Sequence, residues 1–309
     1  MTLSVVVPSY SRAEDLNGCL QALSQQLLAP QEILVVCRRD DDATRQVIAR
    51  WSALLPVLCA VPVDGGGQVA ALNAGLEACR GDIVAFTDDD ARPWPNWTLQ
   101  IEAHFAADAR IGGVGGRDWL YQEGVLQDGA REIVGQITCF GRAVGNHHLG
   151  CGPARQVQFL KGANMSYRRA AIASQRFNRS LKGCGAQVCN DMDFGLCLGS
   201  QGWKLIYDPE VAVDHHLAPR LDSDGRGGFN LETAINRIHN ETLVMLSQLS
   251  RPRRGLFWLY AALIGSKISP GIGMIPLLIR SRRFSALPAL WASLCGRMLG
   301  LRSWLRSRR

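Results

Sequence analysis

The stretch Ile83-Val84-Ala85-Phe86-Thr87-Asp88-Asp89-Asp90 places three carboxylates directly after a short apolar run. The apolar run predicts a buried strand, so the carboxylates lie at the strand's end. Clustered carboxylates repel one another, and burying them is costly unless a cation lies among them. The cluster therefore indicates a site for Mg²⁺ or Mn²⁺, cations that take oxygen ligands and often share them with substrate phosphates. The alternative is an acidic turn before the next helix, which Pro93 and Pro95 would fit.

Short runs rich in Val and Ile alternate with amphipathic helical patterns around this stretch. The strand candidates are 4–7, 32–36, 57–61 and 83–86, and the helix candidates between them are 14–27, 42–54 and 69–79. This alternation predicts an α/β fold with a mostly parallel sheet, in which ligands bind beyond the carboxyl ends of the strands. The three aspartates lie at one of those ends.

The pattern becomes less regular after Pro95. We expect helices over 97–107, 169–173 and 191–201, and an amphipathic helix over 230–249 that leads out of the domain. A strand is expected over 111–116, a turn and an edge strand over 159–167, and two short strands over 205–207 and 211–213 on either side of Pro209. The glycine-rich region up to Gly152 shows no clear pattern.

The charge of the chain is divided unevenly along its 309 residues. From Arg251 onward there are twelve Lys or Arg residues and no Asp or Glu, whereas residues 1–250 contain 22 basic and 27 acidic residues. The basic excess is therefore confined to the tail, which argues against a nucleic-acid-binding core. A hydrophobic content of 47% allows a full core, in one large domain with an appendage or in two domains.

The cysteines and the first residues indicate a cytosolic setting. The ten cysteines are scattered without a C-x-x-C pair, so they fit neither a common zinc pattern nor a disulfide framework. We expect them to be reduced and mostly buried. The first eight residues lack a basic region and end at Pro8, so we expect no secretory signal.

Several segments together resemble a family 2 glycosyltransferase of the GT-A type. They occur in the order and spacing of that family at 5–12, 72–75, 81–90, 162–169, 190–194 and 208–209, followed by His215. The resemblance implies a GT-A fold, a Rossmann-like mixed sheet flanked by helices, over residues 1–225. Residues 226–309 are then a helical linker and a basic, apolar, membrane-associating region.

The resemblance also implies inverting transfer of a sugar from a nucleotide-sugar donor, with a divalent metal bridging the diphosphate. Asp88 and Asp90 would hold the metal together with His215, and Asp191 at the start of a helix would be the general base. The donor-binding residues implied are Pro8, Ser9, Tyr10, Arg12, Asp40, Asn73 and Asp89. The residues implied in the sugar and acceptor pocket are Lys161, Asn164 and Asn190.

Some of these positions keep a structural alternative or depart from the family. His215 and His216 also fit a structural pair, and Ser9 with Tyr10 fits an ordinary turn at a strand end. The family commonly has Asp at the position of Cys37, so Asp40 is the nearest substitute and the nucleotide base stays open. Asn190 stands where the family often has Glu. Lys161 and Asn164 equally fit a turn beside an edge strand.

The tail contains three apolar runs, at 256–264, 268–279 and 284–301, each interrupted by proline or a charge. None is a clean stretch of about 20 apolar residues, the length that a membrane span requires. Arginine clusters flank every run, which favours helices lying in the interface of an anionic membrane, or one re-entrant hairpin. The alternatives are a pair of true spans, and buried helices that pack onto the catalytic domain or onto a partner.

We therefore expect a metal-dependent glycosyltransferase of hexosyl type. It would act on a saccharide or lipid-linked acceptor in cell-surface polysaccharide or glycolipid assembly, at the cytoplasmic face of the inner membrane. One alternative is a sugar-phosphate nucleotidyltransferase, which would need a glycine-rich phosphate loop where this chain has Ser9-Tyr10-Ser11-Arg12. The other alternative is a non-catalytic, membrane-bound scaffold, which the departures from the family at Cys37 and Asn190 would fit.

Overall fold

The computed structural model describes residues 1–218, 229–266, 268–275 and 287–308. The chain forms two compact units. Unit 1 contains Met1–Gln136, Val144–Phe177 and Phe194–Ala218, and unit 2 contains Ile137–Ala143, Asn178–Asp193 and the described part of Pro219–Arg309. The division falls within α5 (Asn190–Ser200). The predicted boundary at residue 225 lies outside the described residues and stays a prediction.

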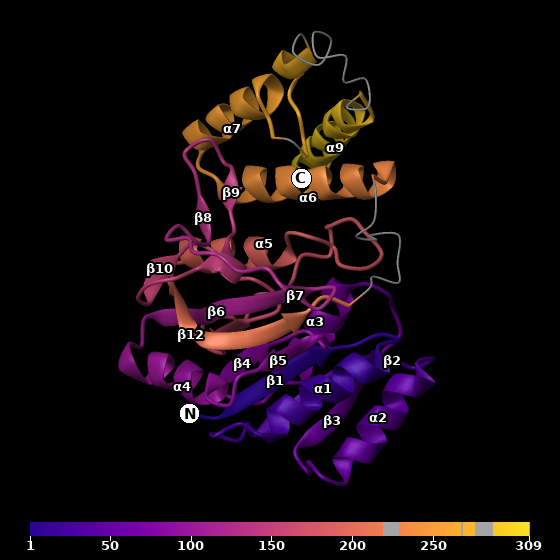
Figure 1. Cartoon of the computed structure of the whole chain (residues 1–309). Coiled ribbons are helices and arrows are strands. Elements are labelled where there is room, and N and C mark those ends of the chain that lie inside the picture. Colours follow the sequence, from indigo (N-terminus) through magenta and orange to yellow (C-terminus); the bar gives the residue numbers. More distant parts are fainter. Residues whose placement is uncertain (219–228, 267, 276–286, 309) are drawn as a thin grey trace. The chain divides into compact units, whose positions relative to one another are not determined.

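The first half of unit 1 is a parallel α/β sheet (Figure 1). The strands β1 (Leu3–Pro8), β2 (Glu32–Arg38), β3 (Leu58–Val63) and β4 (Ile83–Phe86) pair in the order β3-β2-β1-β4. The helices α1 (Ala13–Ser24), α2 (Asp42–Ser52) and α3 (Gln68–Ala78) connect them. Every residue of β4 is buried, as its apolar sequence predicts.

The second half of unit 1 adds strands to β4 and makes the sheet mixed. Helix α4 (Trp97–Ala107) precedes β6 (Ile111–Gln122), and β11 (Met165–Arg168) pairs antiparallel with both β4 and β6. Strand β12 (Lys204–His216) pairs parallel with β6. The strands β4, β6 and β12 therefore run in the same direction. The smaller strands are β5 (Ala91–Pro93), β7 (Val125–Leu126), β10 (Arg155–Val157) and the separate β8 (Gln136–Ile137) and β9 (Ala143–Val144) pair.

Three of the predicted elements differ in the structure. The predicted edge strand is β11, which lies inside the sheet between β4 and β6. Residues 169–173 form turns instead of a helix. The two short strands around Pro209 are one bulged strand, β12, because the register with β6 shifts between Asp208 and Val213. Proline is tolerated at such a bulge because its missing N–H leaves no ladder hydrogen bond unmade.

The bulge in β12 explains a glycine in β6. A Cβ atom added to Gly116 would lie 1.8 Å from the carbonyl oxygen of Val211, so only glycine allows the two backbones to approach. Beyond the bulge, Val213 to His216 pair with Asp118 to Tyr121. This register brings His215 and Asp118 to the same edge of the sheet as the end of β4.

Unit 2 consists mainly of the helices α6 (Leu231–Gln248), α7 (Arg251–Leu263) and α9 (Leu287–Arg306), with the short 3-10 helix η2 (Ile272–Met274). The side chain of Asn230 caps α6 by accepting a hydrogen bond from the backbone N–H of Thr233. Helix α9 packs closely along α6. Among the described residues, no helix has the length and apolarity needed to cross a membrane.

Candidate functional site

Three side chains from the ends of two strands converge at the carboxyl edge of the sheet in unit 1. Asp88 and Asp90 follow β4, and His215 lies at the end of β12. One potential ligand atom from each of these side chains lies within 4.8 Å of the other two. Carboxylate oxygen and imidazole nitrogen are common ligands of divalent metals such as Mn²⁺. The structure thus brings together the three residues that the sequence predicted as metal ligands.

The atoms that face one another in this cluster lack other partners. His215 Nε2 lies 3.2 Å from Asp90 Oδ1, and neither atom has a well-formed hydrogen bond among the residues that the structure describes. Both are buried, and buried polar atoms normally have a partner. The three side chains therefore fit a divalent cation, which would satisfy both atoms.

The other ring nitrogen of His215 faces a carboxylate that sequence reasoning missed. Asp118, in β6, places Oδ2 3.4 Å from His215 Nδ1 and forms an ion pair with Lys161. A carboxylate in this position fixes the histidine tautomer and leaves Nε2 available as a ligand. The signal in the sequence was the pair Arg117-Asp118 directly after the buried run 111–116, because a charge inside a strand needs a partner.

The turn that carries Lys161 is held beside the aspartates. Thr87 donates a hydrogen bond from its hydroxyl to the carbonyl oxygen of Ala163 at 3.0 Å. Asp90 accepts a hydrogen bond at 3.0 Å from the backbone N–H of Ala218, which fixes the chain just beyond β12. The site is thus assembled by contacts among β4, β12 and the turn before β11.

The pKa values of the cluster follow from burial and crowding. Burial alone would lower the pKa of His215, but the nearby carboxylates of Asp118 and Asp90 outweigh it and raise the pKa to about 9. Burial acts in the opposite direction on Asp90, and its contacts with His215, Ala218 and Arg12 still lower the pKa to about 2. For Asp88, burial and the neighbouring Asp90 raise the pKa. Added positive charge would therefore stabilise ionised Asp88.

Asp89 points to a different partner. Its Oδ1 atom lies 3.1 Å from the Nη1 atom of Arg12, which follows β1, and the same guanidinium lies 3.6 Å from Asp90. Burial raises the pKa of Asp89 to about 7, against the opposing charge of Arg12. Asp89 therefore connects the ends of β1 and β4 and is separate from the three metal candidates.

The ends of β1 and β2 form the surface expected to face the donor base. Tyr10 is exposed, and the guanidinium of Arg38 lies 4.5 Å from its ring centroid. Asp40 is exposed and lies 3.3 Å from Arg38. Ser9 is buried beneath this surface, next to Pro8, and Cys37 points into the core. The structure thus places Asp40 near Tyr10 and gives Cys37 no route to a ligand.

Two asparagines are placed differently from our expectation. Both amide atoms of Asn73 bond to the backbone of Phe177, at 2.9 and 2.8 Å. Asn164 is buried, where it accepts a hydrogen bond from the Trp97 indole N–H and donates one to the carbonyl of Val211. This geometry favours structural roles for both side chains over direct contact with the donor or sugar.

Asp191 and Asn190 lie in the part of α5 that belongs to unit 2. Asp191 is half-buried in the first helical turn, where the positive potential of the helix N-terminus favours its ionised form. Asn190 is buried and donates hydrogen bonds to the carbonyls of Ala186 and Gln187, which holds the start of the helix. The base role of Asp191 stays a prediction.

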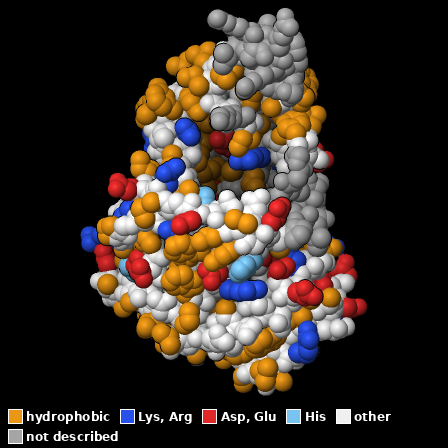
Figure 2. All heavy atoms as spheres, viewed as in Figure 1, with side chains coloured by type: hydrophobic (Ala, Val, Ile, Leu, Met, Phe, Trp, Pro, Cys, Tyr) orange, Lys and Arg blue, Asp and Glu red, His pale blue; other side chains and the backbone are white. Residues whose placement is uncertain are grey.

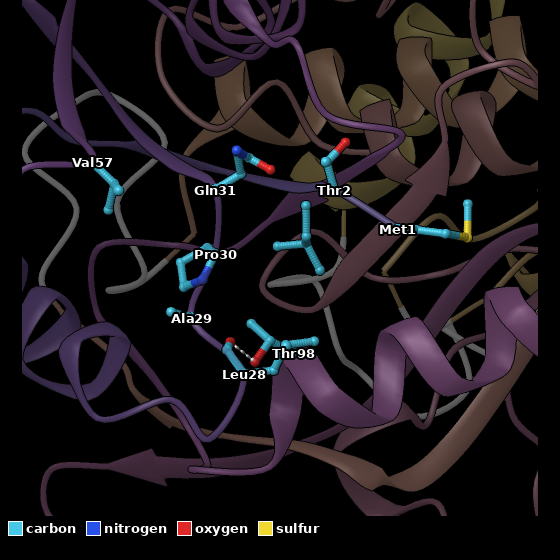
Figure 3. Close-up of a pocket in the computed structure, with 9 residues that line it drawn as sticks. Met1, Thr2, Leu28, Ala29, Pro30, Gln31, Val57 and Thr98 are labelled. Carbon is cyan, nitrogen blue, oxygen red and sulfur yellow. Dashed lines mark hydrogen bonds between the residues drawn. The ribbon is translucent and has the colours of Figure 1, made fainter.

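A cavity of about 310 Å³ in unit 1 lies at the opposite edge of the sheet. Its walls come from the start of β1, the segment before β2 and Thr98 of α4 (Figure 3). Thr98 donates its hydroxyl to the carbonyl of Leu28. Because ligands of such sheets bind at the carboxyl ends of the strands, and the titratable cluster is there, we place the functional site at the aspartates.

The sequence of this chain is similar to known proteins over more than half of its length. The model of the family described as glycosyl transferase family 2 matches residues 4–174. The amylovoran biosynthesis glycosyltransferase AmsB of Erwinia amylovora is 24% identical over 239 residues, which are 74% of this chain and 73% of AmsB.

Two solved structures share the fold. The mannosyltransferase PcManGT of Pyrobaculum calidifontis, in complex with GDP-Man and Mn²⁺, has a TM-score of 0.57 at 17% identity, over 99% of this chain and 88% of that one. Residues 1–349 of S. aureus TarS, in complex with UDP-GlcNAc, have a TM-score of 0.59 at 16% identity, over 99% and 92% of the two chains.

Proposed function

Because this chain belongs to glycosyl transferase family 2, we propose that it is an inverting, metal-dependent enzyme that transfers a sugar from a nucleoside diphosphate donor. The family and the GT-A fold class expected from the sequence are confirmed. The observation that carries the proposal is the convergence of Asp88, Asp90 and His215 at the carboxyl edge of the sheet.

The three side chains would hold Mg²⁺ or Mn²⁺. A cation bound there supplies Lewis-acid stabilisation of the negative charge that develops on the leaving diphosphate. The chain itself contributes the geometry: Asp118 orients His215, and Lys161 neutralises Asp118. Arg12 adds positive charge beside Asp89 and Asp90.

We assign the general base to Asp191. In the proposed reaction the acceptor hydroxyl oxygen bonds to the anomeric carbon while the bond from that carbon to the diphosphate oxygen breaks. The hydroxyl proton passes to the Asp191 carboxylate, and the positive potential at the N-terminus of α5 favours the ionised form of this side chain. Attack from the side opposite the leaving group inverts the anomeric centre.

The residues at the donor surface do not select between nucleotide bases. Tyr10, Arg38 and Asp40 present an aromatic face, a cation and a carboxylate at the ends of β1 and β2. PcManGT was solved with GDP-Man and TarS with UDP-GlcNAc, so guanosine and uridine donors are both candidates.

We further propose that the acceptor is a saccharide or a lipid-linked saccharide in polysaccharide or glycolipid assembly. The relative AmsB, named for amylovoran biosynthesis, supports this substrate class. We place the enzyme at the cytoplasmic face of the inner membrane. Family membership argues against a sugar-phosphate nucleotidyltransferase, and the assembled cluster argues against a non-catalytic scaffold.

The test separates chemistry from binding. Asp191→Asn should reduce transfer on the order of 10²- to 10⁴-fold, the usual contribution of a general base, and leave metal-dependent binding of UDP or GDP unchanged. The exposed pair Arg39–Asp64 provides a control, and Asp64→Asn should alter neither property. Undiminished transfer by Asp191→Asn would contradict the assignment of the base.

A further inference from the structure

The outward side of α9 is apolar. Trp291, Leu294 and Met298 are 59%, 44% and 55% exposed, and their spacing of three and four residues places them on one stripe of the helix. Leu287 and Leu305 are about half exposed and extend the same stripe toward both ends. We call these five residues the α9 stripe. A helix face turned toward water normally carries polar residues, so this one indicates a non-aqueous neighbour.

The opposite side of α9 fixes the orientation of the stripe. A Cβ atom on Gly296 would lie 2.7 Å from Cβ of Ile238, and one on Gly300 would lie 2.7 Å from Cβ of Thr242. These two glycines allow α9 to approach α6 closely. Ser303 adds a hydrogen bond of 2.8 Å to His239. Rotation of α9 to bury the stripe would break this packing, so the stripe faces outward as a consequence of the fold.

Helix α7 carries a second exposed stripe in the same unit. Leu256, Leu259 and Leu263 are exposed and are spaced by three and four residues. Phe257 and Ala261, between them in sequence, are buried. In Figure 2, hydrophobic side chains gather over the part of unit 2 where Figure 1 labels α7. Helices α7 and α9 therefore both carry a stripe of exposed apolar side chains.

The charged residues of the segment that carries these two stripes are all of one sign. No Asp or Glu occurs from Arg251 to the last residue, whereas twelve Lys or Arg residues do. The guanidinium groups of Arg254 and Arg308 lie 5.3 and 4.4 Å from the ring centroid of Trp304, which brings two cations to one indole. Arg254 has its pKa lowered by desolvation and by the charges of Arg308 and Arg251. This group of arginines lacks an acidic partner within its own segment.

We infer that the α9 stripe and the exposed leucines of α7 lie in the interface of an anionic lipid membrane, with the flanking arginines at the level of the lipid phosphates. Apolar side chains with cations on the flanks, and an exposed tryptophan, are the features of helices that lie on such membranes. A second copy of this chain fits less well, because a two-fold contact between these faces would bring arginine clusters together. The inference does not depend on the proposed sugar transfer.

The experiment is cosedimentation of the full chain with lipid vesicles. Vesicles of phosphatidylcholine mixed with phosphatidylglycerol should bind the protein, and vesicles of phosphatidylcholine alone should bind it weakly. The triple variant Trp291→Ser, Leu294→Ser, Met298→Ser should lower the partition coefficient on the order of a hundredfold, because each half-exposed side chain contributes roughly fivefold through burial in the interface.

A second variant separates charge from apolar burial. Arg302→Gln, Arg306→Gln, Arg308→Gln should lower the preference for phosphatidylglycerol on the order of a hundredfold, because each cation near an anionic surface contributes roughly fivefold. The matched control is Leu27→Ser, Leu54→Ser in unit 1, where both leucines are 71% exposed. This control loses comparable apolar surface and should bind vesicles as the unmodified chain does.

Two control measurements test whether the variants remain folded and whether the chain self-associates. Circular dichroism should show unchanged helix content in every variant, since the substituted side chains are exposed. Size-exclusion chromatography over a range of concentrations should show no self-association that the stripe variant abolishes. Failure to bind anionic vesicles would overturn the inference, as would equal loss in the Leu27/Leu54 control or a dimer that depends on the α9 stripe.

Discussion

Replacing Asp118 by Asn tests whether His215 acts as a metal ligand oriented by a carboxylate. The substitution preserves the shape of the side chain, which is 1% exposed, and removes its charge. The amide oxygen can still accept a hydrogen bond from His215 Nδ1, but Lys161 loses its counter-charge and the imidazole becomes a weaker base. The change therefore acts on the cluster without removing any of the three candidate ligands.

The size of the effect follows from the position of Asp118. Loss of a carboxylate that orients a ligating histidine typically lowers metal affinity about 10- to 100-fold, which corresponds to roughly 1.4 to 2.7 kcal/mol. We expect this loss for Mn²⁺ titrated calorimetrically in the presence of UDP or GDP. Asp64→Asn, at an exposed site of unit 1, should retain the affinity of the unmodified protein.

Stability needs a separate readout, because the Asp118→Asn substitution leaves Lys161 without its charged partner. The side chain of Lys161 is 33% exposed, so water can solvate part of its charge and we expect the variant to remain folded. A thermal unfolding curve checks this before the titration. A folded Asp118→Asn variant with undiminished Mn²⁺ affinity would refute the role of Asp118 and would weaken the case for His215 as a ligand.

Three further predictions concern the stability of the fold. Asn73→Ala should lower the free energy of unfolding by about 1–3 kcal/mol, because it leaves the backbone groups of Phe177 without partners. The calorimetric affinity for UDP or GDP should stay constant. A loss of affinity without a loss of stability would show instead that Asn73 contacts the donor. Gly296→Ala should destabilise unit 2 by about 1–3 kcal/mol in chemical denaturation, because its Cβ would crowd Ile238, whereas Gly255→Ala in α7 has open space and should be neutral or stabilising. Burial lowers the pKa of His147 from 6.5 to about 4, so the unfolded chain takes up a proton at this residue more readily than the folded chain does. The free energy of unfolding should therefore fall by on the order of 3 kcal/mol as the pH drops from 6.5 to about 4. In urea titrations across that pH range, His147→Gln should show a smaller decline than the unmodified chain.

The parallel half of the sheet and the helix α4 were predictable because their signals are local. Apolar runs such as 83–86 and the helix at 97–107 carry their own periodicity, and the structure places β4 and α4 at those positions. The position of β11 was not predictable in this way. Its pairing with both β4 and β6 depends on strands far apart in the sequence, so an isolated short run could not reveal that it is central.

Some residues of the candidate site were likewise predictable from the sequence, and others were not. Asp88, Asp90 and His215 were predicted because the resemblance located them, and the structure brings them together. Asp118 was missed because its importance depends on the register between β6 and β12, including the bulge that shifts it. The amide groups of Asn73 and Asn164 pointed to a polar pocket in the sequence, whereas their partners in the structure are the backbone and a buried indole. The residue type alone does not show whether an asparagine lines a pocket or bonds to neighbouring groups of the protein.

The central claim is that Asp88, Asp90 and His215 together hold the cation that binds the donor diphosphate. Crystals grown with Mn²⁺ and UDP or GDP, measured for anomalous scattering of manganese, would test it most directly. The account predicts an anomalous peak in contact with all three side chains and with the diphosphate oxygens. A manganese ion that binds the diphosphate without contacting these three side chains would contradict it.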